Sequence, residues 1–243
     1  MSVFKAYDIR GIAGEELNVE FSERLGKAIA THLGAKSVSI VRDIRESSPR
    51  YHEALVRGLR SSGADVIDLG ISTTGVLYRT TVDLPVDVSV AITASHNPPE
   101  YNGFKICQGK APLGGEDLQD IRRTFEKGEF RTGNGAYRHM DDYEDSYIES
   151  IIESVGGHSR NVRVVLDCGN AVPGPLALRT LERLGVDVIP IYCDWDNSFP
   201  NHPPDPTRQE NMIDLGKAVV ENGAEFGIGM DGDGDRLGVV DEN

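Results

Sequence analysis

Aliphatic segments alternate with amphipathic ones along the whole chain, and this order constrains the fold more than any other feature. Short runs rich in valine, isoleucine and leucine end at polar loops, and each loop leads into a segment with the period of a helix. Such alternation predicts parallel βαβ units, because two parallel strands need a crossover connection between them. The order strand, loop, helix, strand occurs twice, over 38–69 and 162–191.

We therefore predict an α/β protein of two consecutive, related three-layer domains with mixed, mostly parallel sheets. A polar, glycine-rich segment at 131–135 is the best candidate for their boundary, which gives domains 1–135 and 136–243. The expected strands are 3–10, 38–41, 65–69, 86–92, 162–166, 186–191, 224–230 and 237–240. The expected helices are 18–34, 49–62, 74–82, one within 114–128, 141–155, 175–184 and 208–222.

Composition excludes several classes of protein. Hydrophobic residues make up 39% and charged residues 26% of the 243 residues, as in globular proteins. No apolar run is long enough to cross a bilayer, and the N-terminus lacks a signal-peptide core. A net charge of −14 argues against a nucleic-acid partner. The 3 cysteines have no metal-like spacing, so we expect reduced thiols, a cytoplasmic location and no membrane partner.

The sequence Thr93-Ala94-Ser95-His96-Asn97-Pro98 directly follows the aliphatic run at 86–92, which is typical of a buried parallel strand. Asn-Pro-Pro ends that strand. Proline has no backbone N–H to donate to a neighbouring strand, and it restricts the residue before it to an extended or turn conformation. Ser95 is therefore predicted at the carboxyl edge of a sheet, where open α/β folds bind ligands. We expect Lys105, in Asn102-Gly103-Phe104-Lys105, to bring a positive charge back toward this edge.

A second polar loop, Asp231-Gly232-Asp233-Gly234-Asp235-Arg236, follows the predicted strand 224–230. Its glycines allow tight folding, so that aspartates on alternate residues can converge. Clustered carboxylates repel one another, and a hard divalent cation relieves that repulsion. We predict a Mg²⁺ site at Asp231, Asp233 and Asp235, shared with a phosphoryl group; the alternative is a solvated acidic turn.

Two other motifs overlap this loop. Gly227-x-Gly229-x-x-Gly232 matches a dinucleotide-binding fingerprint, but no helix follows it and aspartates would face the pyrophosphate. Asp231, Asp233, Asp235 and Glu242 match positions of a calcium-binding EF-hand loop, but Arg236 replaces its turn glycine and no helix remains after it. Both alternatives are therefore disfavoured.

Ser95 alone is also compatible with an ordinary turn. Neither a G-x-S-x-G elbow nor a His/Asp relay surrounds it, which argues against a serine hydrolase. His96 adjoins Ser95, but consecutive side chains point apart on an extended backbone, so we do not expect His96 to be a direct base for Ser95. A structural histidine is an equal alternative.

These two loops together resemble those of the α-D-phosphohexomutase family, in particular its phosphomannomutase/phosphoglucomutase branch. The supporting segments occur in family order and span the chain: Tyr7-Asp8-Ile9-Arg10-Gly11, Arg42-Asp43-x-Arg45-x-Ser47-Ser48-Pro49, Tyr101-Asn102-Gly103-Phe104-Lys105 and Phe199-Pro200-Asn201-His202-Pro203-Pro204-Asp205-Pro206.

The resemblance implies an isomerase that interconverts hexose 1-phosphate and hexose 6-phosphate through a phosphoserine at Ser95 and a sugar 1,6-bisphosphate. Mg²⁺ would bind Asp231, Asp233, Asp235 and the Ser95 phosphate. Arg10, Lys105 and Arg236 would bind phosphate and offset the acidic surface. Lys105 is the preferred proton-transfer group, assisted by His96, and Arg10 completes the catalytic set.

Family members continue into two further domains, with a sugar-recognition loop and a phosphate-binding loop that this sequence lacks. The chain ends at the turn-like residues 241–243, directly after a strand whose partner we expect to be missing. We therefore expect an N-terminal portion with little or no activity alone, completed by the missing domains. The alternatives are a phosphoglucosamine mutase, a phosphate-ester hydrolase, or a non-catalytic phosphosugar- or metal-binding fragment that needs a partner chain.

Overall fold

The structure, a computed structural model, describes residues 3–156 and 162–242. The chain divides into two compact units. The first comprises Met1–Ala94 and Glu100–Asp141, and the second comprises Ser95–Pro99 and Asp142–Asn243. The short segment Ser95–Pro99 therefore belongs to the second unit, although the chain around it belongs to the first. The predicted domain boundary between residues 135 and 136 stays a prediction.

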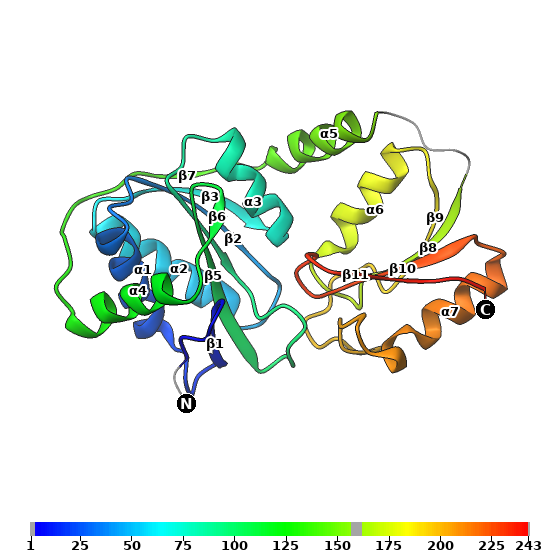
Figure 1. Ribbon diagram of the computed structural model, residues 1–243, viewed down its shortest axis with the longest axis horizontal. Coiled ribbons are helices and arrows are strands. Elements are labelled where there is room, and N and C mark those ends of the chain that lie inside the picture. Colours follow the sequence, from blue (N-terminus) through cyan, green and yellow to red (C-terminus); the bar gives the residue numbers. More distant parts are fainter. Residues whose placement is uncertain (1–2, 157–161, 243) are drawn as a thin grey trace. The chain divides into compact units, whose positions relative to one another are not determined.

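The first unit is built on a mixed sheet in the order β1-β5-β4-β2-β3-β7, with β6 paired to β5 (Figure 1). Strands β4, β2, β3 and β7 run parallel to one another, whereas β5 is antiparallel to both β1 and β4. The strands are β1 (Ile9–Ile12), β2 (Ser37–Arg42), β3 (Asp65–Ile71), β4 (Val88–Ile92), β5 (Tyr101–Gln108), β6 (Ala111–Pro112) and β7 (Tyr137–His139).

Helices cover both faces of this sheet. The helices are α1 (Val19–His32), α2 (Ser48–Ser61), α3 (Thr74–Asp83) and α4 (Glu116–Lys127). Leucine and isoleucine side chains of α1, α2 and α4 pack with Ile40 and Val90 in one apolar core. The α3 face is more polar, because Ser39 of β2 hydrogen-bonds both Thr80 of α3 and Ser89 of β4, each over 2.7 Å. The predicted three layers are therefore present.

The second unit repeats the arrangement on a smaller sheet in the order β11-β10-β8-β9. The apolar face of α7 packs with Val165 and Ile189, and that of α6 packs with Leu166, Val188 and Ile228, so that the two helices cover opposite faces (Figure 1). The elements are α5 (Tyr143–Val155), β8 (Arg163–Asp167), α6 (Pro173–Arg183), β9 (Asp187–Ile191), the 3₁₀-helix η1 (Gln209–Met212), α7 (Ile213–Asn222), β10 (Phe226–Met230) and β11 (Leu237–Val240).

The two polar loops of the sequence occupy corresponding places in their sheets. The loop after β4 connects it to the antiparallel strand β5, and β4 itself is parallel to β2. In the same way, the loop after β10 connects it to the antiparallel strand β11, and β10 is parallel to β8. Each loop therefore leaves the carboxyl end of a parallel strand, which is where ligand sites of α/β sheets form.

Two expectations are corrected. The strand at 237–240 was expected to lack its partner, but it pairs antiparallel with β10, from Met230↔Leu237 to Gly227↔Val240. The helix expected at 208–222 is divided into η1 and α7. Asn211 at this junction is buried, and its side-chain amide donates to the carbonyl oxygen of Asp205 over 2.9 Å.

None of the helices within residues 3–156 and 162–242 combines the length and the apolar composition needed to cross a bilayer. Cys107, Cys168 and Cys193 are all buried, and none of them forms a disulfide in the described residues.

Candidate functional site at the Ser95 and Asp231 loops

Ser95 has an unusual backbone conformation. Its φ angle is +53°, in the left-handed region that residues with a Cβ seldom adopt. The residue is only 3% exposed. Such conformations persist where the surrounding structure enforces them, and they cluster at functional sites.

The aspartate loop is a tight turn organised by the first of its carboxylates. Oδ1 of Asp231 accepts hydrogen bonds from the backbone N–H groups of Asp235 and Arg236, each over 3.0 Å. The backbone N–H of Gly234, whose φ is +73°, donates to the carbonyl oxygen of Asp231 over 3.1 Å. One oxygen from each of Asp231, Asp233 and Asp235 lies within 4.8 Å of the others. The first two are buried and Asp235 is exposed.

Ser95 contacts this cluster directly. Its Oγ donates a 2.7 Å hydrogen bond to Oδ2 of Asp231. Gly232 makes the approach feasible, because a Cβ at that position would lie 2.2 Å from the carbonyl oxygen of Ser95. The alternation of glycine and aspartate therefore serves two purposes here: the aspartates supply the carboxylates, and Gly232 leaves room for the serine loop.

Arg236 supplies the positive charge at this site. Its Nη2 donates to Ser95 Oγ over 2.7 Å and to Asp231 Oδ2 over 2.6 Å, and its Nε donates to the same Oδ2 over 3.1 Å. Its Nη2 also contacts Nδ1 of His96.

His96 lies closer to Ser95 than the sequence argument allowed. Its Nδ1 is 3.3 Å from Ser95 Oγ, although we expected the two side chains to point apart. That expectation assumed an extended backbone, whereas the left-handed conformation of Ser95 turns both side chains toward Arg236. His96 is therefore placed to share the hydroxyl with Asp231 and Arg236.

The electrostatics of the cluster favour a cation. Burial, and then the negative charge of Asp233, raise the pKa of Asp231 to about 6, and Asp235 adds to the effect. The hydrogen bond from Ser95 and the charge of Arg236 oppose this shift without cancelling it. The charged form of a buried carboxylate is thus disfavoured unless more positive charge is supplied. Three close carboxylates offer the hard oxygen ligands that Mg²⁺ prefers, so the donor set fits that ion.

Arg10 and Lys105 belong to the first unit. Arg10 of β1 pairs with Gly103 of β5, and Lys105 lies two residues further along β5, so that both residues share one face of the sheet. Arg10 forms an ion pair with Asp8. Lys105 is half-buried opposite Ala91 of β4. The roles predicted for these two residues stay predictions.

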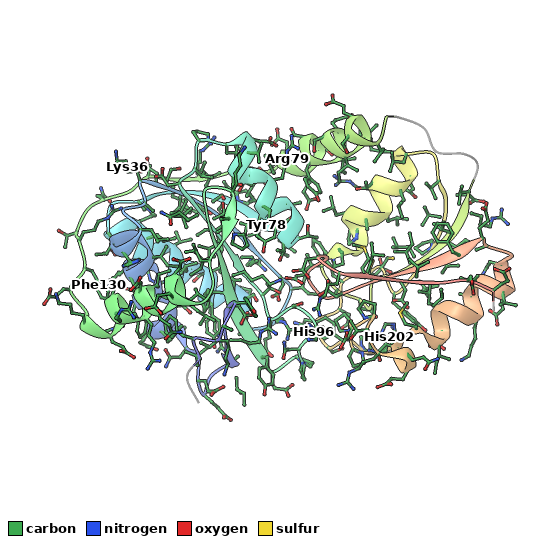
Figure 2. All side chains as sticks on the ribbon, in the orientation of Figure 1. Lys36, Tyr78, Arg79, His96, Phe130 and His202 are labelled. Atoms are coloured by element: carbon green, nitrogen blue, oxygen red, sulfur yellow. The ribbon has the colours of Figure 1, made fainter. Side chains whose placement is uncertain are left out.

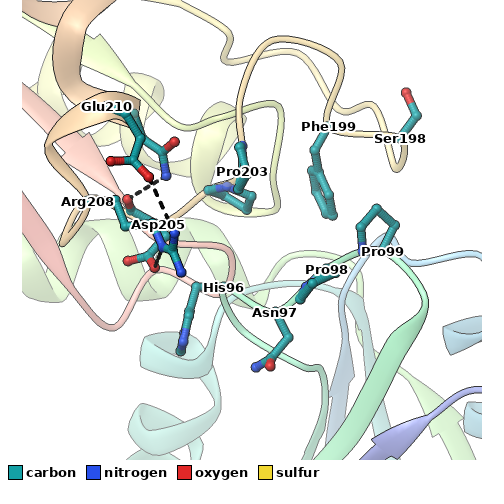
Figure 3. Close-up of a pocket in the computed structure, with 12 residues that line it drawn as sticks. His96, Asn97, Pro98, Pro99, Ser198, Phe199, Pro203, Asp205, Arg208 and Glu210 are labelled. Carbon is teal, nitrogen blue, oxygen red and sulfur yellow. Dashed lines mark hydrogen bonds and ion pairs between the residues drawn. The ribbon is translucent and has the colours of Figure 1, made fainter.

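A cavity of about 590 Å³ adjoins the Ser95 loop within the second unit (Figure 3). Its lining is His96, Asn97, Pro98, Pro99, Ser198, Phe199, Pro203, Pro204, Asp205, Arg208, Glu210 and Asn211. Arg208 bridges Asp205 and Glu210 on one side of this cavity.

Asp205 is a buried acidic residue that motif reasoning did not assign to the site. Burial raises its pKa, but hydrogen bonds from Thr207 and the charges of His96 and Arg236 outweigh burial and lower it. The signal in the sequence was the proline-rich segment around it, which we recognised only by resemblance.

The competing motifs do not fit the observed elements. The strand β11 follows the aspartate loop directly, whereas a dinucleotide fingerprint or an EF-hand would need a helix there.

Comparisons with known proteins agree with the fold. Residues 1–132 match the model of the phosphoglucomutase/phosphomannomutase alpha/beta/alpha domain I, and residues 145–243 match that of domain II. The phosphomannomutase/phosphoglucomutase of Pseudomonas aeruginosa is 40% identical over 242 residues, covering 98% of this chain and 52% of the relative. The phosphomannomutase of Salmonella typhimurium is 39% identical, covering 100% of this chain and 56% of the relative.

A solved structure is also similar. The crystal structure of a phosphoglucomutase/phosphomannomutase family protein from Burkholderia thailandensis has a TM-score of 0.94 and 39% identity, covering 99% of this chain and 54% of that one. The chain thus spans about half the length of the curated relatives it matches. With both of its domain models matched in order, the chain belongs to the phosphoglucomutase/phosphomannomutase family.

Proposed function

We propose that this chain carries the phosphoryl-transfer centre of a hexose-phosphate mutase, with Ser95 as the residue that carries the phosphoryl group. The observation that supports this most directly is the position of Ser95 Oγ, which lies 2.7 Å from both Asp231 Oδ2 and Arg236 Nη2. A hydroxyl held between a carboxylate cluster and a guanidinium suits an atom that alternates between neutral and phosphorylated forms, because phosphoryl transfer depends on positioning and charge neutralisation.

The proposed reaction moves one phosphoryl group in each direction. A hydroxyl oxygen of the hexose monophosphate attacks the phosphorus on Ser95, the bond from phosphorus to Oγ breaks, and Oγ takes up a proton. The resulting sugar 1,6-bisphosphate turns around. Oγ of Ser95 then attacks its other phosphorus, that phosphate's bond to the sugar oxygen breaks, and the sugar oxygen is protonated. Atoms and charge balance over the cycle, which leaves Ser95 phosphorylated.

The roles of the remaining residues are part of this proposal. Asp231, Asp233 and Asp235 would hold Mg²⁺ together with an oxygen of the Ser95 phosphate, and the ion would neutralise charge on the transferred group. Arg236 would stabilise the same oxygens from the other side through charge-assisted hydrogen bonds. Lys105 would exchange the proton with the sugar hydroxyl, His96 would assist, and Arg10 would bind phosphate.

Substrate and location follow from the family and the composition. The curated relatives are named for mannose and glucose phosphates, which supports these hexoses over glucosamine. A sugar 1,6-bisphosphate is the proposed activator. The domains that the longer relatives possess are the proposed source of the sugar-binding groups. A cytoplasmic location remains a prediction from the cysteine usage.

Phosphorylation of the 243-residue chain tests the central claim. Incubation with glucose 1,6-bisphosphate and Mg²⁺ should add one phosphoryl group by intact mass, and peptide mapping should place it on Ser95. Asp235→Asn should slow this strongly, because it removes one carboxylate of the proposed Mg²⁺ site. Asp235 is the exposed member of the cluster, so we expect this variant to fold. Asp141→Asn, which changes an exposed carboxylate whose side chain is 86% accessible, is the matched control.

Modification of any residue other than Ser95, or of none, would refute the proposed carrier. Equal rates with and without Mg²⁺ would refute the metal site. Release of free phosphate in step with loss of the bisphosphate would instead indicate a hydrolase.

A further inference from the structure

His202 is a partly buried histidine of the second unit (labelled in Figure 2), in the loop between β9 and η1. Its Nε2 lies 3.0 Å from Oδ2 of Asp167, at the end of β8, and its Nδ1 lies 2.9 Å from the carbonyl oxygen of Pro203. The Asp167 side chain is 2% exposed and the His202 side chain is 15% exposed. The phosphoryl-transfer chemistry proposed above uses neither residue.

The contacts of its two ring nitrogens favour the protonated form of His202. Each nitrogen faces an oxygen, one from a carboxylate and one from a carbonyl, and both oxygens accept hydrogen bonds. A neutral imidazole has one N–H and can satisfy only one of them, whereas an imidazolium satisfies both. The hydrogen bond with Asp167 raises the pKa of His202 above its usual range, and the Pro203 carbonyl adds to this, while burial opposes it.

The residues that follow His202 connect it to the aspartate loop. The carbonyl oxygen of Pro204 accepts a 3.1 Å hydrogen bond from the backbone N–H of Gly232, which lies between Asp231 and Asp233. Pro204 is also packed against Gly169, where a Cβ would lie 3.0 Å from Pro204 Cα and 3.3 Å from His202 Cε1. The Pro203-Pro204 corner therefore lies between the imidazolium and the carboxylate cluster.

The other charged groups around His202 also favour its charged form. Tyr192 packs edge-on against its ring with centroids 5.6 Å apart, and the Tyr192 hydroxyl donates to Asp214 of α7 over 3.2 Å. Asp214 is also paired with Lys217 over 2.9 Å. The charge of Asp214 acts in the same direction as that of Asp167 on the pKa of His202.

We propose that His202 is a positioning residue for the Asp231–Asp235 loop, and that its protonated ring holds the Pro203-Pro204 corner against Gly232. Loss of the proton gives up one of the two hydrogen bonds, loosens the corner and weakens divalent-cation binding at the three carboxylates. The second half of this statement rests on the proposed Mg²⁺ site; the first half concerns the metal-free chain.

The sign of the pH effect distinguishes deprotonation of His202 from protonation of the carboxylates. When the pKa of a histidine is higher in the folded chain than in the unfolded chain, its protonation stabilises the fold. This stabilisation is complete below the pKa of the unfolded state, about 6.5, and is lost as the pH rises through the pKa of the folded state. Mg²⁺ affinity should therefore fall on the alkaline side. Protonation of ligating carboxylates acts on the acid side and in the opposite direction.

The test follows two signals of the full 243-residue chain between about pH 6 and pH 9, the range in which histidines titrate. Without metal, the amide ¹H and ¹⁵N shifts of Gly232 should move with the same midpoint as the ring carbons of His202. By calorimetry, the affinity for Mg²⁺ should fall about three- to tenfold across that midpoint. This is less than the roughly 10–100-fold loss that is typical when a residue hydrogen-bonded to a metal ligand is removed.

Two variants and a control sharpen the result. His202→Gln should abolish the alkaline step in both signals, and Asp167→Asn should move the midpoint of both to lower pH. His52→Gln is the matched control, because it removes the corresponding 3.0 Å pair with Asp68 in the first unit and should leave both signals unchanged.

A Gly232 amide whose chemical shifts do not change with the His202 titration in the wild-type chain would overturn the proposal, even if the variants fail to fold. A Mg²⁺ affinity that stays flat across that midpoint would overturn its second half. Absence of Mg²⁺ binding at any pH would refute the metal site of the proposed function, and with it the second half, while leaving the Gly232 test intact.

Discussion

The backbone of Ser95 gives a prediction at the scale of one residue. Its φ of +53° should make alanine costly at this position, since the left-handed region disfavours a Cβ by roughly 1–2 kcal/mol. Both Ser95→Ala and Ser95→Gly lose the hydroxyl and its hydrogen bonds, so their difference isolates the backbone. We expect the glycine variant to be more stable than the alanine variant by about 1 kcal/mol in chemical unfolding.

The same pair of substitutions at Ser150, within helix α5, is the control. There alanine should be the more stable by about 1 kcal/mol, because glycine is a poor helix residue. An alanine variant at least as stable as the glycine variant at position 95 would contradict the conformation described for Ser95.

Site residues were predictable from the sequence where the chemistry was local. Ser95 and the three aspartates could be proposed because each group sits in a short motif that ends a strand. The contact between His96 and Ser95 was missed, because it depends on a left-handed backbone conformation at Ser95. The sequence does not predict that conformation for a serine. Asp205 and His202 were missed as site residues because a main partner of each, Arg236 for Asp205 and Asp167 for His202, is distant in the sequence.

At the scale of elements, the crossing of α1 and α2 depends on two glycines. A Cβ at Gly58 of α2 would lie 2.0 Å from the carbonyl oxygen of Glu23, and one at Gly26 of α1 would lie 2.5 Å from that of Leu55. The clashing atoms are backbone, so they cannot rotate away. Gly58→Ala should therefore destabilise the chain by about 1–3 kcal/mol, the usual range for overpacking, as measured by urea unfolding.

Gly216 in α7 provides a control of the same chemical type. A Cβ there meets no atom within 4 Å, so Gly216→Ala should stabilise the chain by about 0.5–1 kcal/mol through helix propensity alone. If both variants change the free energy of unfolding in the same direction, the close packing of α1 on α2 is not the reason that position 58 requires glycine.

Except for β7 and the divided helix at 208–222, the helices and parallel strands were predicted to within a few residues, because their apolar periodicity is strong. The exceptions depend on tertiary contacts. Strand β5 contains asparagine and glycine, and its strand conformation comes from pairing on both sides, with β1 and β4. The division of the predicted helix at 208–222 accompanies the buried Asn211, whose side chain bonds the Asp205 carbonyl.

At the scale of the whole molecule, the order of the motifs indicated the family, and the comparisons agree; the chain spans about half the length of the curated relatives it matches. The roles of Arg10 and Lys105 could not be settled in the same way, because a role in catalysis depends on contacts with substrate rather than on a local pattern. The net charge of −14 predicts that the protein as a whole repels a phosphate, but it does not identify the residues that offset this repulsion. The structure places one positive group, Arg236, at Ser95.

The final prediction concerns turnover by the chain as it stands. The chain should accept one phosphoryl group on Ser95 yet convert glucose 1-phosphate to glucose 6-phosphate slowly or not at all in a coupled assay. The physical reason is that the bisphosphate must be held while it turns around, and the resemblance places the groups that bind the sugar and its second phosphate in the half that the relatives carry beyond this chain. The full-length Pseudomonas aeruginosa relative, assayed alongside, shows that the assay reports turnover. Sustained conversion by the 243-residue chain that disappears in Ser95→Ala would show instead that these two units suffice to retain and reorient the intermediate.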